Sequence, residues 1–323
     1  HMWNKEYIIG LLLIFIFASC EKEEIPLDYM PPEQAASEFT DQVSMGADYR
    51  YRLYYDLESD SVIAFHEKRD WDLAFSTSGD GLIRLNTSKF MSVYKTGSTD
   101  IATQVNFQGN GPKYDTSDGA EEGTAIGTLE AGRVYIVDRG YDETGAALGF
   151  VRFSFASISS DSYLINYGPL GQSSFAEATV PRDSSVNQVM FSFDTGVEFL
   201  EPPKETWDLL FTHYTYYFVN EDLQYLVSGA LLNPYQVTAA KVTDQSYAAM
   251  DLGIASSYEF KTESDVIGYD WKAFDLENGT YNVMDNLYLI QTSEANVYKF
   301  SFTGFYDPSG AQGAPIFKAT LLQ

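Results

Sequence analysis

Hydrophobic and polar residues alternate along much of the chain after residue 48, and this pattern predicts β-strands. In Val297-Tyr-Lys-Phe-Ser-Phe302 the aromatic residues take every second position, which places them on one face of a strand. Segments rich in Tyr, Phe, Val and Thr alternate with Gly, Asn, Asp and Ser, and no apolar stripe with helical spacing persists for several turns. The pattern predicts an all-β protein made of antiparallel sheets that each cover a core with one face.

Two pairs of such segments predict hairpins. Residues 286–292 and 296–302 are separated by three residues, which is the length of a tight hairpin turn. Residues 134–140 and 149–155 form a similar pair, joined by a longer polar loop over 141–148. We expect each pair to form neighbouring strands of a sheet.

A seven-residue pattern occurs twice, as RDWDLAF at 69–75 and ETWDLLF at 205–211. Three further landmarks recur in the same order, at offsets that differ only by plausible loop insertions. These are Tyr55-Asp56 with Phe193-Asp194, 134–137 with 287–290, and 152–155 with 299–302. The ordered recurrence predicts a tandem duplication, with a first β domain over 49–175 and a second over 176–323. We expect Trp71 and Trp207 in the core, with Asp72 and Asp208 capping or pairing locally.

The N-terminal residues have the pattern of a secretory signal. Lys5 precedes an apolar run over 7–17, and small residues lead to Cys20. Phe17-Ala-Ser-Cys20 resembles a bacterial lipobox, which predicts cleavage before Cys20 and a diacylglycerol group on its thiol. Cys20 is the only cysteine, so its thiol is available for lipid, and several acyl chains would anchor the protein durably. We predict a lipoprotein signal peptide over 1–19 and a lipidated tether over 20–48.

The tether begins with Glu21-Lys-Glu-Glu24, which resembles the surface-export signal of Bacteroidetes lipoproteins. The resemblance implies an outer-membrane lipoprotein that faces the cell surface, with the periplasmic side as the alternative. The formal net charge is −26, and a surface of this sign repels nucleic acids and anionic headgroups. We therefore expect membrane attachment through lipid alone and no nucleic-acid partner.

The landmarks together resemble the HmuY-like family of Bacteroidetes outer-membrane lipoproteins, whose founding members bind haem. In the second half the resemblance includes Tyr269-Asp-Trp-Lys-Ala-Phe274, 288–290, 298–299, 302–306 and 310–317. In the first half it includes 51–65, 71–75, 82–86 and 135–155. The resemblance implies an all-β fold of two tandem HmuY-like antiparallel domains, each a twisted sheet assembly.

The resemblance also implies two axial histidines or methionines on the variable middle of a domain. The chain has three histidines; His1 lies in the signal, and His66 and His213 flank the Trp-Asp-Leu strands, where they are interpreted as structural. Residues 87–133 and 219–286 contain no histidine. Met91, Met250 and Met284 are the available methionines, and a Met250/Met284 pair would be the alternative haem clasp. Methionine also fills gaps in cores, so no cofactor is the primary expectation.

Catalytic patterns are absent from the sequence. It contains no G-x-S-x-G elbow, P-loop, dinucleotide glycine fingerprint or H-E-x-x-H pair. The acidic loop over 115–122 lacks the spacing of a calcium loop, so we interpret it as a solvated loop and predict no metal site. The protein is predicted not to be an enzyme; a surface glycan hydrolase or glycan-binding protein is an alternative function.

A group of tyrosines is the candidate partner interface, because tyrosine supplies stiff amphipathic contact area; packing within the sheet is the other interpretation. The group comprises Tyr214, Tyr216, Tyr217, Tyr225 and Tyr235. We predict a non-enzymatic binding or accessory subunit of an outer-membrane complex, such as a TonB-dependent transporter or another barrel assembly. A haem-binding protein with methionine ligands is the alternative.

Overall fold

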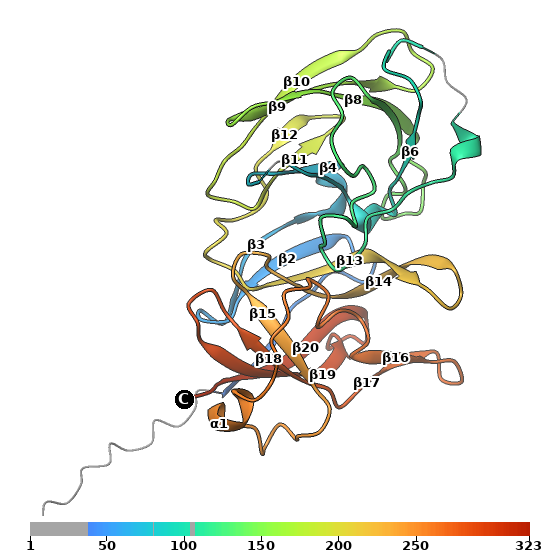
Figure 1. The fold of residues 1–323 in the computed structure, drawn as a ribbon. Helices are drawn as coiled ribbons and strands as arrows, with labels where there is room; N and C mark the ends of the chain where they lie inside the picture. Colours follow the sequence, from blue (N-terminus) through green and yellow to red (C-terminus); the bar gives the residue numbers. More distant parts are fainter. Residues whose placement is uncertain (1–37, 80, 104–106) are drawn as a thin grey trace, which may run out of the picture. The chain divides into compact units, whose positions relative to one another are not determined.

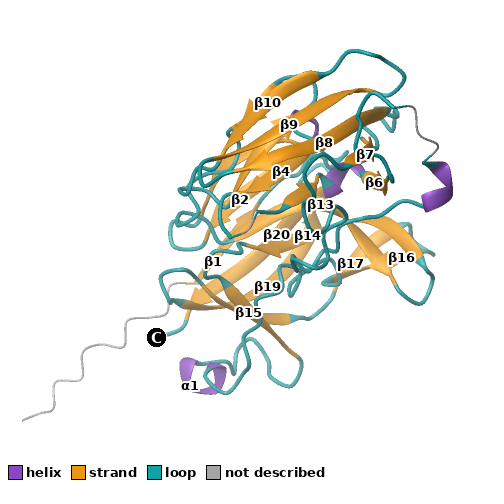
Figure 2. Cartoon of the chain, turned by 45° about the horizontal axis from the view of Figure 1, so that its top comes forward, coloured by secondary structure: helices purple, strands orange, loops and turns teal. Residues whose placement is uncertain are grey.

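The computed structural model describes residues 38–79, 81–103 and 107–323, and antiparallel strands dominate this part of the chain (Figures 1 and 2). The prediction of an all-β protein is confirmed. The short helical turns are η1 (Lys68–Asp70), η2 (Thr87–Lys89), η3 (Gln108–Asn110) and α1 (Leu252–Ala255). No helix among the described residues is long and apolar enough to span a bilayer. The predicted signal peptide and Cys20 lie outside the described residues.

Two sheets formed by one continuous stretch of chain enclose a first core, and we call this unit the inserted lobe. Its five-stranded sheet has the order β10-β9-β8-β7-β6, and its four-stranded sheet has the order β12-β11-β4-β5. The strands are β4 (Leu73–Ser76), β5 (Ile83–Leu85), β6 (Ser92–Lys95), β7 (Val134–Asp138), β8 (Phe150–Ile158), β9 (Ser162–Pro169), β10 (Ala176–Pro181), β11 (Gln188–Ser192) and β12 (Gly196–Glu198). Alternate side chains of both sheets, such as Phe75, Phe153 and Phe191, meet in this core.

The remaining strands form a terminal lobe from both ends of the described chain. Its five-stranded sheet has the order β1-β20-β19-β18-β15, its four-stranded sheet has the order β14-β13-β2-β3, and β16 and β17 form a separate hairpin. The strands are β1 (Glu38–Gln42), β2 (Tyr51–Asp56), β3 (Ser61–Glu67), β13 (Leu209–Phe218), β14 (Leu223–Leu232), β15 (Thr238–Val242), β16 (Lys272–Asp275), β17 (Thr280–Val283), β18 (Leu287–Gln291), β19 (Val297–Tyr306) and β20 (Gln312–Leu321). In Figure 1 the blue β2 lies beside the yellow β13, and β3 follows on the other side of β2.

Both predicted hairpins are present. Strand β18 pairs with β19 through a turn in which Ala295 has a φ of 65°, and β7 pairs with β8 across the longer loop. Strand β1 corrects the predicted tether over 20–48, because residues 38–42 pair with β20 and Phe39 packs against the terminal core. The hydrophobic contact of Phe39 explains why this segment is a strand.

The repeated pattern has a repeated hydrogen-bond arrangement. The Asp72 amide donates to Phe191 O, and the Asp208 amide donates to Tyr55 O. Each aspartate carbonyl accepts from an asparagine amide, from Asn86 in the first case and Asn233 in the second. The side chain of Asn86 donates to the carbonyls of residues 68 and 71, and that of Asn233 to the carbonyls of residues 204 and 207. The structural equivalent of Tyr55 is therefore Phe191, not Phe193 as the order of landmarks in the sequence predicts.

The two copies of the pattern exchange partner strands. Strand β4 pairs with β11, and β13 pairs with β2, so each Trp-Asp strand is completed by a strand from the other predicted half. The predicted boundary between 175 and 176 separates β9 from its neighbour β10 and does not coincide with a sheet boundary. The tandem duplication itself stays a prediction.

The two tryptophans are buried at the contact between the lobes rather than in the two large cores. Trp71 packs with Ala74 and Met190, and Trp207 packs with Tyr54 and Leu210. The Arg52 guanidinium of the terminal lobe lies 4.9 Å from the centre of the Trp71 ring of the inserted lobe. The outer faces of the two four-stranded sheets thus hold the lobes together.

Candidate functional site

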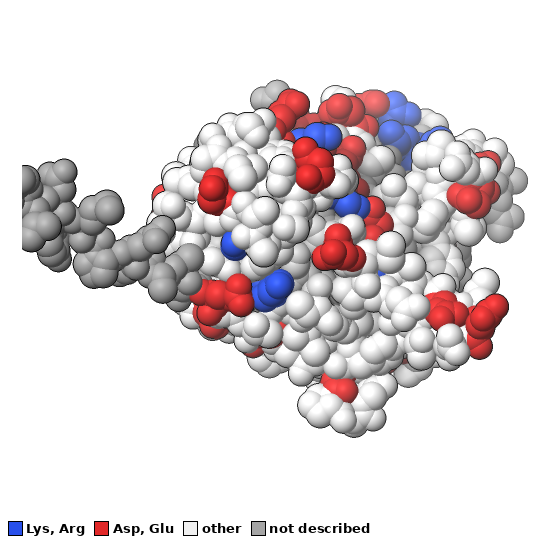
Figure 3. Space-filling model, turned by 90° about the horizontal axis from the view of Figure 1, so that it is seen from below, with Lys and Arg blue, Asp and Glu red and all other residues white. Residues whose placement is uncertain are grey.

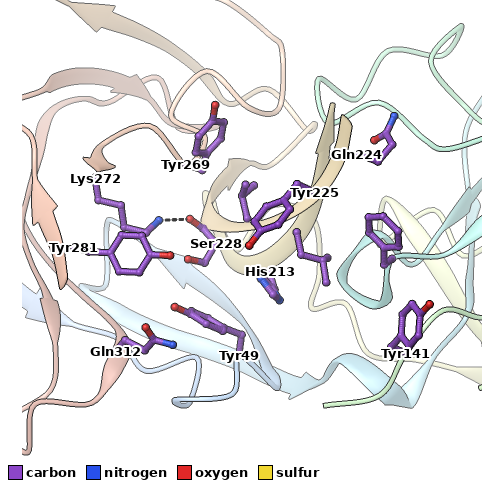
Figure 4. Close-up of a pocket in the computed structure, with 13 residues that line it drawn as sticks. Tyr49, Tyr141, His213, Gln224, Tyr225, Ser228, Tyr269, Lys272, Tyr281 and Gln312 are labelled. Carbon is purple, nitrogen blue, oxygen red and sulfur yellow. Dashed lines mark hydrogen bonds between the residues drawn. The ribbon is translucent and has the colours of Figure 1, made fainter. Parts of the chain in front are cut away.

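A cavity of about 540 Å³ lies where the lobes meet (Figure 4). Strand β14 supplies one wall through residues 224–228, and the region of the β16–β17 hairpin supplies another. The inserted lobe contributes Phe90 and Tyr141. The full lining comprises Tyr49, Phe90, Tyr141, His213, Gln224, Tyr225, Leu226, Val227, Ser228, Tyr269, Lys272, Tyr281 and Gln312. Five tyrosines and no carboxylate occur among these described residues, although the chain contains 46 aspartates and glutamates.

Two of the aromatic residues that line the cavity have an uncommon backbone conformation. Tyr49 has a φ of 54° and Phe90 a φ of 62°, values that bulky residues rarely adopt. Phe90 ends η2, whose Thr87 carbonyl accepts a hydrogen bond from the Thr215 side chain of β13 at 2.8 Å. Such strain persists only where surrounding contacts maintain it, and it is concentrated at binding sites in folded proteins. A contact between the lobes therefore supports the part of the cavity wall that Phe90 forms.

His213 lies on β13 at the edge of the cavity. Its ring stacks on Tyr49 with centroids 4.7 Å apart, and its Nδ1 atom is buried with no hydrogen-bond partner among the described residues. Burial, followed by the positive charges of Lys68 and Lys272, lowers the pKa of His213 to about 3. The imidazole is therefore neutral at physiological pH. The sequence pattern around His213 indicates a structural histidine and does not indicate that it borders a cavity.

His66 does not line this cavity. Its Nε2 lies 3.4 Å from the Tyr54 hydroxyl, and its Nδ1 lies 3.0 Å from the Glu67 carbonyl. Burial, with a smaller contribution from Arg52, lowers the pKa of His66 to about 3. These contacts are those of a structural histidine.

Lys272, at the start of β16, brings a buried ammonium group to the cavity. Its Nζ donates a hydrogen bond to Ser228 O and lies 4.3 Å from the Trp271 ring centre and 4.8 Å from that of Phe305. Burial lowers the pKa of Lys272 to about 7, opposed in part by Asp270. Asp270 is paired with Lys241 at 2.7 Å. The lysine is thus enclosed by aromatic rings rather than by acids.

The structure separates the five predicted interface tyrosines. Tyr225 is 58% exposed and lines the cavity, and Tyr217 is also exposed, with its hydroxyl 2.7 Å from Asp222. Tyr214 is buried, and Tyr216 packs against Tyr269.

Tyr235 lies apart from that group. The Lys204 ammonium group is 4.8 Å from its ring centre, and its hydroxyl donates to Glu205 at 3.3 Å. Tyr235 therefore contributes to neither the cavity nor a surface shared with Tyr225.

The three candidate haem-ligating methionines are not brought together. Met91 is buried in the core of the inserted lobe, and Met250 is buried in a small cluster with Leu287 and Leu289. Met284 is 45% exposed after β17, and its amide donates to Trp271 O. None of the three lines the cavity.

The acidic loop over 115–122 has a structural use. The buried Asp115 carboxylate accepts the backbone amides of Leu85 and Ala125, each at 2.7 Å. The Ser117 hydroxyl donates to Asp265 of the terminal lobe at 2.5 Å. The loop therefore fastens the inserted lobe to the terminal lobe.

The two lobes make up an all-β protein, and the tyrosine-lined cavity between them is large enough to hold a small-molecule ligand. The model of the family described as HmuY protein matches residues 48–318, and the chain belongs to the HmuY family. This single match spans both predicted copies. The comparison with curated proteins found no match.

Solved structures of low sequence identity are similar over most of their length. Apo PinO from Porphyromonas gingivitis has 10% identity, covers 89% of this chain and 98% of its own, and gives a TM-score of 0.30. The apo HmuY analog from Tannerella forsythia has 9% identity, covers 89% and 97%, and gives 0.25. A Bacteroides vulgatus protein described as a proposed HmuY-like haem-binding protein has 10% identity, covers 87% and 90%, and gives 0.23. Because these TM-scores are low, family membership rests on the match over 48–318.

Proposed function

We propose that this protein is a non-enzymatic binding protein whose cavity holds a planar, largely apolar ligand, with a porphyrin as the first candidate. The observation that carries the proposal is the tyrosine-lined cavity of about 540 Å³ between the lobes. Aromatic walls with a few polar groups suit a flat conjugated ligand, because ring faces stack and buried apolar area drives binding. Membership of the HmuY family supports a porphyrin.

The residues that line the cavity suit the porphyrin ring of haem better than they suit the haem iron. Haem iron is held in proteins by His, Cys, Met or Tyr side chains. Among the lining residues, His213 and the phenols are the available ligands, and His213 Nδ1 is buried without a partner. Ligation by Met250 and Met284 receives no support, because neither lines the cavity. Iron bound here would supply redox or ligand-exchange chemistry, whereas the chain's own residues would enclose the ring and exclude water.

Titration of the full chain with haemin and with metal-free protoporphyrin IX tests this proposal. We expect both to bind, with tryptophan fluorescence quenched and the Soret band shifted. Tyr225→Ala should weaken binding about tenfold through loss of one stacking surface. Tyr217→Ala is the matched control, because Tyr217 is exposed on the same hairpin but does not line the cavity. Binding of neither porphyrin, or equal weakening by both substitutions, would contradict the proposal.

The cellular setting is proposed from the N-terminal sequence: a lipid anchor at Cys20 on the outer membrane, facing the cell surface. The lipobox-like Phe17-Ala-Ser-Cys20 and the following acidic residues support it. Cys20→Ala should abolish acyl labelling and release the protein from the membrane fraction. Protease treatment of intact cells distinguishes the cell surface from the periplasmic side.

We further propose that the protein has a partner, an outer-membrane transporter or another barrel assembly, and passes its ligand to it. Affinity purification from native outer membranes in gentle detergent tests this step. Copurification of one barrel protein supports it, and recovery of the chain alone counts against it while leaving the ligand proposal intact.

A further inference from the structure

The ammonium group of Lys272 has more hydrogen-bond donors than the protein uses. A protonated lysine carries three donors, and the described residues accept one of them, through Ser228 O. Lys272 is only 8% exposed, so water cannot freely solvate the remainder. A buried ammonium group without a carboxylate partner is costly, and the surrounding rings compensate only in part. A hydrogen-bond acceptor on a ligand in the cavity would bind the unused donors of Lys272.

The groups around Lys272 favour an anion. From β13, the neutral His213 faces the cavity, with Lys68 as a second positive charge near it. From β17 and the segment before β2, the phenols of Tyr281 and Tyr49 remain neutral, because burial raises the pKa of each.

Asp270 is the acid that acts on Lys272, and it is already paired with Lys241. The molecule as a whole is strongly acidic, and Figure 3 shows acidic side chains in several separate groups over one face. The lining of the cavity therefore contains the amino group of Lys272 and no carboxylate, within an acidic protein.

We propose that the ligand of this cavity is an organic acid, whose conjugated body lies against the tyrosines and whose carboxylate binds the ammonium group of Lys272. This inference rests on the proposed function and specifies its ligand class. A carboxylate accepts the unused donors in charge-assisted hydrogen bonds, which are among the strongest in a low-dielectric site. Figure 4 shows the hydrogen bond that joins Lys272 to Ser228, with Tyr281 beside it.

Protoporphyrin IX and its dimethyl ester provide the test, because they share one ring system and differ in the two carboxylates. At about pH 6 the full chain should bind the diacid at least about tenfold more tightly than the ester. The preference should decline between about pH 6 and pH 9 as Lys272 loses its proton, since only the ammonium form attracts the carboxylate.

Lys272→Met should abolish the preference, because it weakens binding of the diacid more than binding of the ester, and Lys272→Arg should retain it. Lys204→Met is the control, because Lys204 is a half-buried lysine that lies against Tyr235, does not line the cavity and leaves the pair Lys241–Asp270 intact. If Lys272→Met fails to fold, the pH profile of the unmodified chain decides the question.

Equal binding of the diacid and the ester by the unmodified chain overturns the inference and leaves the proposed function standing. A preference that persists in folded Lys272→Met also overturns it. Binding of neither porphyrin overturns the proposed function, and the inference with it.

Discussion

Asp72 and Asp208 occupy equivalent backbone positions, yet Asp72 is held by two cations whereas Asp208 faces two other carboxylates. Asp72 Oδ1 accepts from Lys89 Nζ, and Arg139 Nη2 lies 3.0 Å from Asp72 Oδ2. Asp208 has Asp56 and Glu58 as neighbours, with carboxylate oxygens of all three within 4.8 Å of one another.

Despite this difference, the side chain of each aspartate accepts a hydrogen bond from a backbone amide at an equivalent position. Asp72 Oδ2 accepts from the Phe193 amide at 2.8 Å, and Asp208 Oδ2 accepts from the Leu57 amide at 2.9 Å. Each joins the repeated strand to the end of its exchanged partner strand. The electrostatic difference between the two positions therefore arises from their surroundings and not from their backbone geometry.

Asp208→Asn should stabilise the protein at alkaline pH. Burial, followed by the charge of Glu58, raises the pKa of Asp208 to about 8 from its ordinary value of 3.8. The folded state therefore binds more protons than the unfolded state between these values, and stability falls as pH rises through them. Asparagine resembles the protonated carboxyl group and avoids this loss. We expect its free energy of unfolding to exceed that of the unmodified chain by at least about 1 kcal/mol at about pH 8.

Urea denaturation at several pH values checks this expectation. The difference between the two proteins should shrink toward about pH 4, where Asp208 is protonated in the folded state and about half protonated in the unfolded state. Burial also raises the pKa of Glu201 to about 7 and that of Asp115 to about 6, so the variant should keep part of the pH dependence. A difference that does not change with pH would assign the effect to packing instead.

Asp72→Asn should be strongly destabilising at neutral pH. The side chains of Asp72 and Lys89 are both fully buried, so the substitution leaves a buried ammonium group without its counter-charge. Breaking such a pair costs about 3–5 kcal/mol. Adding Lys89→Met should recover part of this loss in thermal or chemical denaturation. The exposed pair Arg133–Glu130 is the control, since Glu130→Gln should change stability by less than about 1 kcal/mol.

Asn86→Ala and Asn233→Ala should have similar effects on stability. Each asparagine is buried, and its amide donates to two backbone carbonyls around the repeated tryptophan. Loss of these donors leaves buried carbonyls unsatisfied, at about 1–3 kcal/mol for each group. Equilibrium denaturation should show both losses, whereas Asn220→Ala in an exposed turn should change little. A large effect at only one of the two sites would contradict their structural equivalence.

Gly229→Ala should destabilise the chain and also weaken binding in the cavity. A Cβ added at Gly229 would collide with the carbonyl oxygen of Gly268, so the backbone just before Tyr269 and Lys272 would have to move. Overpacking of this kind costs about 1–3 kcal/mol. Gly97→Ala is the matched control, because a Cβ added there would have nothing within 4 Å. Thermal denaturation measures the stability of both variants, and porphyrin titration measures their binding. Unchanged binding by folded Gly229→Ala would show that the cavity does not depend on the contact between Gly229 and Gly268.

The local elements of the fold could be predicted because alternation and turn length are short-range signals. The hairpins β7–β8 and β18–β19 followed directly from them. The choice of partner strand could not be predicted, because Tyr55 and Phe191 present similar aromatic strands to either Trp-Asp segment. Two nearly equal pairings are then possible, and the sequence does not distinguish them.

The cavity could not be predicted for a related reason. Its walls come from residues that are distant in sequence, such as Phe90 of the inserted lobe and Tyr281 of the terminal lobe. Spacing along the chain carries no information about such a meeting. Of the tyrosines that the sequence suggested, only Tyr225 lines the cavity, whereas Tyr214 is buried and Tyr216 packs against Tyr269.

The pairing of β1 with β20 imposes an order on the maturation of the chain. Glu38 lies opposite Thr320, so the terminal lobe cannot close until β20 has been synthesised. The inserted lobe, formed by continuous chain, can fold before that point. Strand β1 must meanwhile remain without its partner and exposed to aggregation or to a holding chaperone, whereas β2 and β3 can already pair with each other. Deletion of β20 should therefore leave a protein with one folded lobe and a protease-sensitive remainder.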